Sequence, residues 1–463
     1  MNLYFNGFAY TNALKEEDKL DLNKLIDSYR EDIVNLTREL IAIPSEAGLP
    51  SRGKPFGEYP YKALQYALDS ARKLGFKVKN IDGYGGYAEF GEGSEVLGIL
   101  AHLDIVPPGK GWSFPPYEGQ IHDEKIYGRG AIDNKGPAAA ALYAMKAVMD
   151  LGIPINKKVR LIFGSDEERG SKDMEYFFSK EPMPDFAIIP DANYPVIHAE
   201  KGILTLAFEK KFDSDETNVC SIKSVKGGTR SNVVPDECIS TFSLPSDGDK
   251  ILTHLNTFKE YAKYDMSADF DEKGGLVIKS KGISAHASTP ENGENAIGQL
   301  IEFLSTLGLG DTQIEKFILF INDKIGMDYY GKLMGLDMED DVSGKLTLNL
   351  GIVDVDQNRG KAVVNIRYPV TYKLKDIMDK VYDAIDGTDV EVKIEGHTSP
   401  LYIPKDDPMV KKLLRIYEEQ TGQKAEALAI GGGTYARSVK KGVAFGAQFP
   451  GKPEMAHEKD EYI

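Results

Sequence analysis

Cysteine is almost absent from this 463-residue chain, which contains only Cys220 and Cys238. Two cysteines are too few for a disulfide framework or a cysteine-ligated metal site, so a reduced, cytoplasmic setting is expected. The sequence also lacks a signal peptide and any apolar run of about 18 residues, which argues against a membrane-spanning protein. Residues 1–8 resemble no signal-peptide core, and no structure or function is predicted for them.

Basic residues are outnumbered as well. The chain has 56 Lys and Arg residues against 72 Asp and Glu residues, which gives a net charge of −16. Because like charges repel, this excess disfavours nucleic acids and anionic membranes as partners. The simpler interpretation is that the net charge only keeps the protein soluble.

The length is too great for one compact core, and two or three domains are expected. Over residues 96–197, apolar strand-like runs alternate with helical segments, which predicts a mainly parallel sheet covered by helices. Strands after this region, such as 203–212, alternate apolar and polar residues and favour an antiparallel sheet. We predict an α/β domain of the phosphorylase/hydrolase-like kind, with a mixed, mainly parallel sheet, formed by 1–197 and 398–463. An α+β lid domain, built as two halves, is expected as an insertion over 198–397.

Three helices stand out within the first domain. Apolar residues recur at helical spacing over 21–43 and 61–74, so each range is expected to form one helix. Residues 136–151 are rich in alanine and other helix formers, and Gly152 and Pro154 follow them as helix-ending residues.

Side chains with metal-binding chemistry follow the apolar runs of the first domain. In open α/β sheets the carboxyl ends of the strands carry the ligand site. Imidazole nitrogen and carboxylate oxygen are ligands for zinc and manganese, and the set is large enough for two ions. The candidates are His102, Asp104, Asp133, Glu167, Glu168, Asp191 and His457.

Local geometry leaves some of these roles open. His102 and Asp104 project from the same face of a strand, so Asp104 is expected to accept the ring N–H of His102. Asp133 precedes the 136–151 helix and could equally serve as its N-cap. Glu167 and Glu168 are adjacent, so one is expected to bind metal and the other to carry a proton.

Six segments follow one another along the chain: HLDIVPPGKGWSFPPYEG, YGRGAIDNKGP, GSDEERGS, PDANYP, KGISAHASTPENGENA and MAHEKDEYI. In this order they resemble the zinc aminopeptidase–carboxypeptidase–aminoacylase superfamily. Within it, the chain is similar over nearly its whole length to the bacterial cytosolic Xaa-His, or carnosinase-type, dipeptidases. The length of the 198–397 insertion also fits that group.

The resemblance implies two divalent ions, with zinc foremost and manganese or cobalt as alternatives. It places one ion on His102 and Asp191 and the other on Glu168 and His457, with Asp133 bridging them. The peptide bond that follows Asp133 is expected to be cis.

The same resemblance implies the remaining roles in catalysis. Glu167 would be the general base and Asp104 the partner of His102. His286, in GISAHAS, would stabilise the transition state from the lid, although a surface-loop histidine is the alternative.

Substrate-binding residues are expected in two places. Asn232 and Arg367 match the dipeptidase pattern on the lid, and a guanidinium can grip a substrate carboxylate in a forked geometry. An ordinary sheet-face cation is the alternative for Arg367. In AIGGGTYAR, a glycine turn after a strand can present N–H groups to an anion, but tight packing explains it equally well. Its candidate residues are Gly432, Tyr435 and Arg437.

The residues and the resemblance together predict a cytoplasmic, monomeric metallodipeptidase that hydrolyses unblocked Xaa-His or β-Ala-Xaa dipeptides. One alternative is a deacylase of N-acyl or N-succinyl amino acids from the same superfamily. Another is a non-catalytic protein that binds peptides or metals, against which the presence of Glu167 argues. The other histidines carry no motif and are interpreted as structural: His122, His198, His254 and His397.

Overall fold

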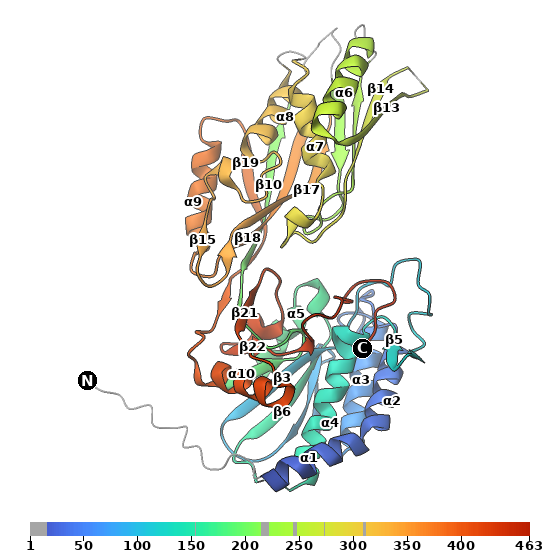
Figure 1. Cartoon of the computed structure of the whole chain (residues 1–463), viewed down its shortest axis with the longest axis vertical. Helices are drawn as coiled ribbons and strands as arrows, with labels where there is room; N and C mark the ends of the chain where they lie inside the picture. The colour runs from blue at the N-terminus through green and yellow to red at the C-terminus, as the bar shows by residue number, and fades with distance from the viewer. Residues whose placement is uncertain (1–15, 153, 214–221, 244–247, 273, 309–311) are drawn as a thin grey trace, which may run out of the picture. The chain divides into compact units, whose positions relative to one another are not determined.

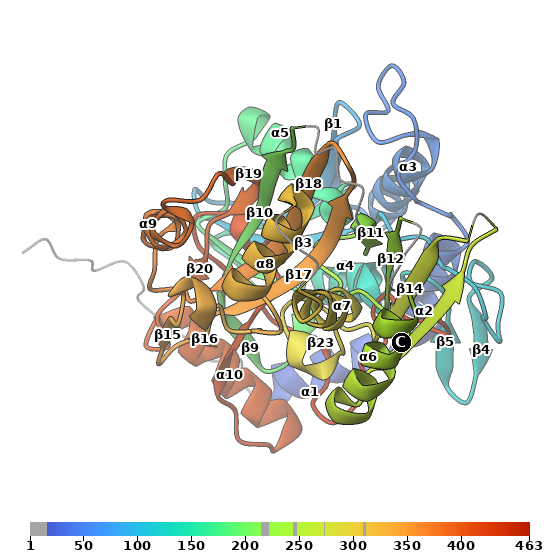
Figure 2. The same ribbon diagram turned by 90° about the horizontal axis from the view of Figure 1, so that it is seen from above.

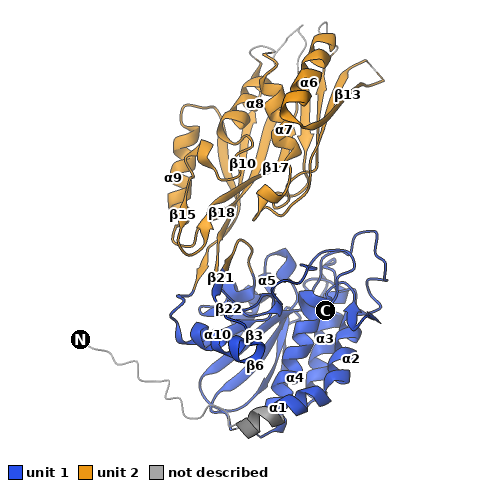
Figure 3. Ribbon diagram, in the orientation of Figure 1, with its two compact units in different colours: residues 1–198, 403–428, 434–463 blue, residues 199–402, 429–433 orange. Residues whose placement is uncertain are grey.

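A computed structural model describes residues 16–463 except 153, 214–221, 244–247, 273 and 309–311 (Figure 1). Residues 1–8 and Cys220, both discussed above, lie outside the described residues. The chain divides into two compact units, which are described separately (Figure 3). Unit 1 comprises residues 1–198, 403–428 and 434–463, and unit 2 comprises residues 199–402 and 429–433.

A mixed sheet forms the centre of unit 1. Strands β6, β3, β7 and β22 are parallel to their neighbours in the middle of this sheet. Both edges are antiparallel, and a short turn makes β1 and β2 a hairpin. The predicted α/β class is therefore confirmed, with the parallel pairing confined to the centre. In spatial order the strands are β1 (Lys77–Ile81), β2 (Gly85–Phe90), β6 (Lys158–Gly164), β3 (Val96–His102), β7 (Phe186–Ile189), β22 (Gly442–Ala444), β9 (Val196–Glu200) and β20 (Leu401–Tyr402), while β21 (Ala427–Ile430) pairs with β9.

Helices cover both faces of this sheet. Alternate residues of a strand point to opposite faces, and on β2 Ala88 packs in the cluster beneath α3 whereas Tyr87 contacts Phe177 of α5. Small side chains on α4, such as Ala138 and Ala139, are buried in the α3 cluster. The helices of unit 1 are α1 (Glu16–Ser28), α2 (Arg30–Ile41), α3 (Glu58–Lys73), α4 (Gly136–Asp150), α5 (Lys172–Lys180) and α10 (Pro408–Thr421).

The prediction of one helix over 21–43 is wrong. The chain leaves the helical conformation at Tyr29, with φ −88° and ψ 1°, between α1 and α2. The Tyr29 ring packs against Tyr143 of α4 at 5.5 Å, and its hydroxyl donates to Asp150. This tertiary contact breaks a pattern whose apolar spacing continues across the break.

Unit 2 is built on an antiparallel sheet of eight strands, as predicted for the insertion. Its helices α7 and α8 lie against the sheet (Figures 1 and 2). Their apolar side chains join Phe208 and Ile366 in one core. In spatial order the strands are β13 (Asp265–Phe270), β14 (Leu276–Lys281), β12 (Glu237–Phe242), β11 (Ile222–Gly227), β17 (Thr347–Val355), β18 (Arg359–Tyr368), β10 (Gly202–Lys211) and β19 (Glu391–Thr398). The helices are α6 (Gly248–Ala262), α7 (Ala296–Ser305), α8 (Gln313–Lys324) and α9 (Leu374–Ile385).

Shorter elements complete both units. Three strand pairs are β4 (Gln120–His122) with β5 (Lys125–Tyr127), β8 (Ala192–Asn193) with β23 (Ala447–Gln448), and β15 (Glu339–Asp340) with β16 (Gly344–Lys345). Short helical turns are η1 (Ala131–Lys135), η2 (Glu167–Arg169), η3 (Pro290–Asn292), η4 (Lys332–Met334) and η5 (Tyr435–Ser438). Within the described residues, every helix is too short or too polar to cross a membrane.

Candidate active site

The parallel strands of unit 1 deliver polar side chains to one edge of the sheet. His102 is the last residue of β3 and lies in register with Gly164, the last residue of β6. Glu167 begins the turn η2 just after β6, and Asp191 follows β7. Because parallel strands end at the same edge, these side chains meet there.

Asp133 lies between two imidazoles. Its Oδ1 is 2.8 Å from His102 Nε2, and its Oδ2 is 3.1 Å from His457 Nε2. Asp191 Oδ2 lies 3.5 Å from His102 Nε2, and Glu168 Oε1 lies 3.1 Å from His457 Nε2. The five side chains thus form two groups that share Asp133, and in each group the three ligand atoms lie within 4.8 Å of one another. Each group could hold one metal ion.

The local conformation of Asp133 excludes the alternative role as a helix cap. Helix α4 begins at Gly136, and Lys135 occupies its N-cap position. Asp133 belongs to the preceding turn η1, where its φ of −124° and ψ of 86° are not helical. The peptide bond between Asp133 and Asn134 is cis, in agreement with the expectation from the sequence.

Asp104 supports the site through two different atoms. The Nδ1 of His102 lies 3.0 Å from the backbone carbonyl oxygen of Asp104 and 3.5 Å from its carboxylate. In the neutral imidazole that a metal requires, the Nδ1–H would donate to this carbonyl and Nε2 would be free to serve as a ligand. The Asp104 carboxylate instead accepts the backbone N–H groups of Glu167 at 3.2 Å and Glu168 at 3.1 Å. Asp104 thus fixes both the tautomer of His102 and the start of η2.

Burial and mutual repulsion perturb the carboxylates of the site. Desolvation raises the pKa of Glu167 well above its ordinary value, and the charges of Asp191 and Glu168 add to this effect. Desolvation also raises the pKa of Asp191 to about 6 and that of Glu168. Desolvation acts to lower the pKa of His457, but hydrogen bonds to Asp133 and Glu168 raise it to about 11. Such a concentration of like charge favours bound cations.

Metal binding is expected to release protons at neutral pH. Metal ligands are neutral imidazoles and ionised carboxylates, whereas without a cation the pKa of His102 is raised well above 6.5 and that of His457 to about 11. Two bound cations should therefore displace about two protons at pH 7. Affinity should rise with pH, and it should fall more steeply below about pH 6, where Asp191 also protonates.

Calorimetric titration with Zn²⁺ in two buffers of different ionisation enthalpy measures this release. The apparent binding enthalpy should depend on the buffer at pH 7. Identical enthalpies in both buffers would contradict the protonation states assigned to the two histidines.

Tyr435 is not placed to contact a substrate, so its predicted binding role is wrong. Its side chain is fully buried, and its hydroxyl donates to the buried Asp173. The ring centroids of Tyr435 and His102 lie 6.2 Å apart in a T-shaped contact, so Tyr435 helps to hold the imidazole in place. Gly164 makes room for this ring, since a Cβ there would lie 1.9 Å from the Tyr435 hydroxyl oxygen.

Two predicted lid residues lie side by side in unit 2. His286 is exposed and forms a β-bridge with Val233, and Ala287 N–H donates to the Asn232 carbonyl at 3.0 Å. The backbone N–H of Ser288 donates to His286 Nδ1 at 3.3 Å. Nδ1 also lies 2.7 Å from the Ser288 hydroxyl oxygen, which can donate to it or accept from it. In the tautomer in which Nδ1 accepts both Ser288 groups, the ring proton is on Nε2.

Arg367 and the glycine turn form a second cluster in unit 2. Arg367 is buried, so it is not an ordinary exposed cation on a sheet face. Its Nε donates to Asn365 at 2.7 Å and its Nη1 to the Gly431 carbonyl at 2.9 Å, next to Gly432. Arg437 lies in η5 of unit 1 and is partly buried. The four histidines interpreted as structural lie, like His286, outside both metal-binding groups of the described chain: His122, His198, His254 and His397.

Two buried residues of this site escaped the sequence analysis. Glu461 and Arg129 form an ion pair of 2.6 Å directly beside the turn that carries Asp133. Both lie in segments that carried the family resemblance. The sequence alone does not distinguish a buried charged residue from an exposed one, so no signal marked them.

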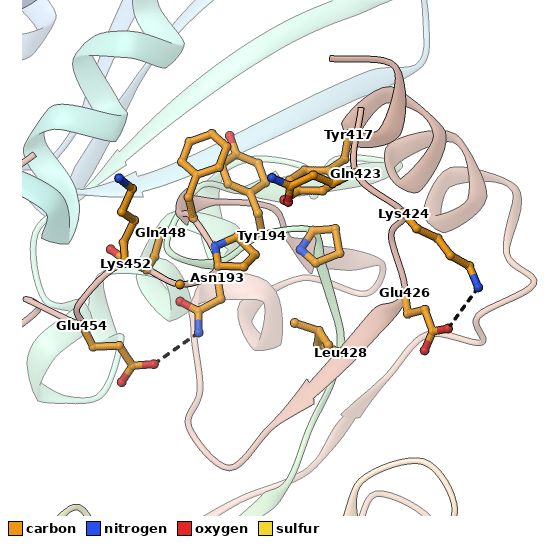
Figure 4. Close-up of a pocket in the computed structure, with 14 residues that line it drawn as sticks. Asn193, Tyr194, Tyr417, Gln423, Lys424, Glu426, Leu428, Gln448, Lys452 and Glu454 are labelled. Atoms are coloured by element: carbon orange, nitrogen blue, oxygen red, sulfur yellow. Dashed lines mark hydrogen bonds and ion pairs between the residues drawn. The ribbon is translucent and has the colours of Figure 1, made fainter. Parts of the chain in front are cut away.

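A cavity of about 480 Å³ lies elsewhere in unit 1 (Figure 4). Its wall contains Tyr194, whose ring lies 4.7 Å from Phe449 and 5.6 Å from Tyr417. As the described residues define it, the cavity includes none of the metal-binding candidates. The candidate site is therefore identified by its metal-binding side chains and not by this cavity.

Comparisons with known proteins match this chain to a family of peptidases. The model of peptidase family M20/M25/M40 matches residues 98–463. A Bacillus subtilis protein named "Putative dipeptidase YtjP" is 41% identical over 441 residues, covering 94% of this chain and 93% of the relative. A Staphylococcus saprophyticus protein with the name "Putative dipeptidase SSP1012" is 35% identical over 446 residues, covering 95% and 94%.

Two solved structures share the fold. Human carnosine dipeptidase 1 aligns with a TM-score of 0.55 and 17% identity, covering 97% of this chain and 95% of that one. The aminoacylhistidine dipeptidase of Vibrio alginolyticus aligns with a TM-score of 0.54 and 13% identity, covering 92% of each chain. At these identities the likeness extends to the fold alone.

Proposed function

The chain belongs to peptidase family M20/M25/M40, whose model matches residues 98–463, and we propose that it is a dipeptidase with two divalent cations. The observation that carries this proposal is the position of Asp133, with one carboxylate oxygen toward each of two imidazoles. His102 and Asp191 would hold one cation, and Glu168 and His457 the other. Asp133 would join the two.

The donor set fits zinc best, because it mixes imidazole nitrogen with carboxylate oxygen. Manganese and cobalt accept the same ligands and remain alternatives. Bound divalent cations would lower the pKa of a water molecule and polarise the scissile carbonyl.

Glu167 is the proposed general base. Burial and the neighbouring carboxylates raise its pKa, which suits a group that takes a proton from water and passes it to the leaving amine. The bond from its backbone N–H to Asp104 holds it at the edge of the site.

The lid residues are proposed to bind the substrate. His286, with its proton on Nε2, would donate a hydrogen bond to the developing oxyanion. Asn232 would bind substrate beside it, and Arg367 would bind the substrate carboxylate near Gly432. Arg437 is proposed to contact substrate from unit 1.

Substitution of His286 by alanine should lower kcat by about 10²–10³-fold, with a smaller effect on KM. The reason is that its hydrogen bond forms mainly in the transition state. His254→Ala is the matched control, since His254 is also an exposed unit 2 histidine and bonds to Thr306. Steady-state kinetics of both variants decide the matter, and a pure KM effect would assign His286 to ground-state binding.

We propose unblocked Xaa-His and β-Ala-Xaa dipeptides as substrates of a monomeric, cytoplasmic enzyme. The two relatives named as dipeptidases support a short substrate. The small number of cysteines supports the reducing compartment.

A peptide panel on the metal-reconstituted protein tests this function. Free dipeptides should be hydrolysed, whereas their N-acetylated forms and the matching tripeptides should be much poorer substrates. Release of acyl groups from N-acetyl or N-succinyl amino acids would establish a deacylase instead. A fully metal-loaded protein without turnover on any of these compounds would contradict an enzymatic role.

A further inference from the structure

A buried ion pair connects two segments that carry metal-ligand candidates. Arg129 is 2% exposed and Glu461 is 0% exposed, and Arg129 Nη1 donates to Glu461 Oε2 at 2.6 Å. Arg129 lies two positions before the first residue of the turn η1, and Glu461 lies four positions after His457 in the sequence. The chemistry proposed above uses neither residue.

The Glu461 carboxylate binds the backbone of the turn that contains Asp133. Its Oε1 accepts the N–H groups of Ile132 at 3.0 Å and Asp133 at 3.2 Å, and its Oε2 accepts that of Gly130 at 3.1 Å. Asp133 has non-helical torsions, so its N–H needs a partner outside a regular helix. Glu461 supplies that partner and fixes the backbone of the shared ligand.

Arg129 holds the other ligand segment. Its Nη2 donates to the backbone carbonyl of His457 at 2.9 Å. His457 has a φ of +66°, a left-handed conformation that is unfavourable for a residue with a Cβ and therefore needs external support. The Arg129 guanidinium lies over the ring of Trp112, 5.3 Å from the ring centroid, and this cation–π contact helps to hold it.

Further contacts hold the segment 457–463 in place within unit 1. Gly128 N–H donates to the Glu461 carbonyl at 2.9 Å, and Ser113 N–H donates to the Asp460 carboxylate at 2.6 Å. The segment is therefore placed by the same region that contains Arg129.

We infer that Glu461 and Arg129 are positioning residues that set the two metal-binding groups relative to each other. Glu461 fixes Asp133 and so acts on both groups, whereas Arg129 fixes His457 and acts on the group of Asp133, Glu168 and His457. The inference rests on the metal assignment of the proposed function.

The test compares Glu461→Gln and Arg129→Lys with a matched control, Glu89→Gln. Glu89 accepts Arg160 Nε at 2.8 Å and Nη2 at 2.6 Å in the sheet of unit 1, so it belongs to a comparable Arg–Glu pair away from the metal-binding groups. Dissociation constants for Zn²⁺ and Mn²⁺ are measured by competition with a chromogenic chelator. Emission from Trp112, the single tryptophan, follows the same titration. Glu168→Ala removes a ligand from the group of Asp133, Glu168 and His457 only, so the dissociation constant that it changes belongs to the cation of that group.

Glu461→Gln should bind both cations about 10- to 100-fold more weakly, as expected when a partner that orients metal ligands is lost. Arg129→Lys keeps the charge but loses the fork that reaches His457, so it should weaken mainly the cation that Glu168→Ala weakens. Glu89→Gln should lower the thermal unfolding temperature and leave both dissociation constants unchanged.

Wild-type affinities in Glu461→Gln would overturn the inference, and so would equal weakening in Glu89→Gln. If Glu461→Gln does not fold, Arg129→Lys decides, and unchanged affinities there overturn the inference. A wild-type chain that binds two cations but hydrolyses no dipeptide would refute the proposed function, while the variant affinities still decide the roles of Glu461 and Arg129. A wild-type chain that binds no cation would refute both.

Discussion

Replacement of Glu167 by alanine is expected to lower kcat for dipeptide hydrolysis by about 10²–10⁴-fold while both cations remain bound. Glu167 lies beside the two metal-binding groups but belongs to neither of them. Its loss should remove the proton carrier and leave the ligands in place. Steady-state kinetics together with metal analysis of the purified variant measure both effects.

The pH profile separates a proton carrier from a structural residue. A general base must be ionised, so kcat/KM of the wild type should fall as the pH drops below the pKa of Glu167 in the loaded enzyme. Glu167→Gln retains the size of the side chain and should lack this acid limb. Glu175→Ala, an exposed acidic position on α5, serves as the control and should retain wild-type kinetics. Loss of both cations from Glu167→Ala would contradict the assignment as base.

Asp133→Ala should weaken the binding of both cations by more than about 100-fold and abolish hydrolysis. The effect should exceed that of losing a residue that only orients a ligand, because Asp133 is proposed to bind both cations directly. In contrast, Asp191→Ala and Glu168→Ala each remove a ligand from one group only. Each should therefore weaken one cation and largely spare the other.

Metal stoichiometry and affinity in the three variants measure this pattern. Asp133→Ala is expected to lose two cations, whereas Asp191→Ala and Glu168→Ala are each expected to lose one. An Asp133→Ala protein that retains either cation at wild-type affinity would contradict the bridging position.

The sequence was sufficient to predict the strand-end part of the site. His102 and Asp191 follow apolar runs of parallel strands, whose carboxyl ends meet at one edge whatever the details of packing. The convergence of Asp133 and His457 depends on how distant turns fold back on the sheet. Local pattern alone left Asp133 with a capping alternative, and the family resemblance was needed to predict the bridge.

Burial explains what the sequence did not reveal. The direction of η5 turns Tyr435 inward above Gly164, whereas the glycine turn alone was compatible with an exposed ring. The contact of Tyr29 with α4 broke a helix whose apolar spacing continued without interruption. Glu461 is a carboxylate in an otherwise polar segment, and only tertiary structure shows that backbone N–H groups surround it. Each case depends on contacts between residues far apart in the chain.

Anomalous diffraction from crystals grown with Zn²⁺ or Mn²⁺ tests most directly whether Asp133 joins two cations. We expect two anomalous peaks, one beside His102 and Asp191 and the other beside Glu168 and His457, with one Asp133 oxygen bound to each. A single peak, or two peaks that Asp133 does not touch, would contradict this account.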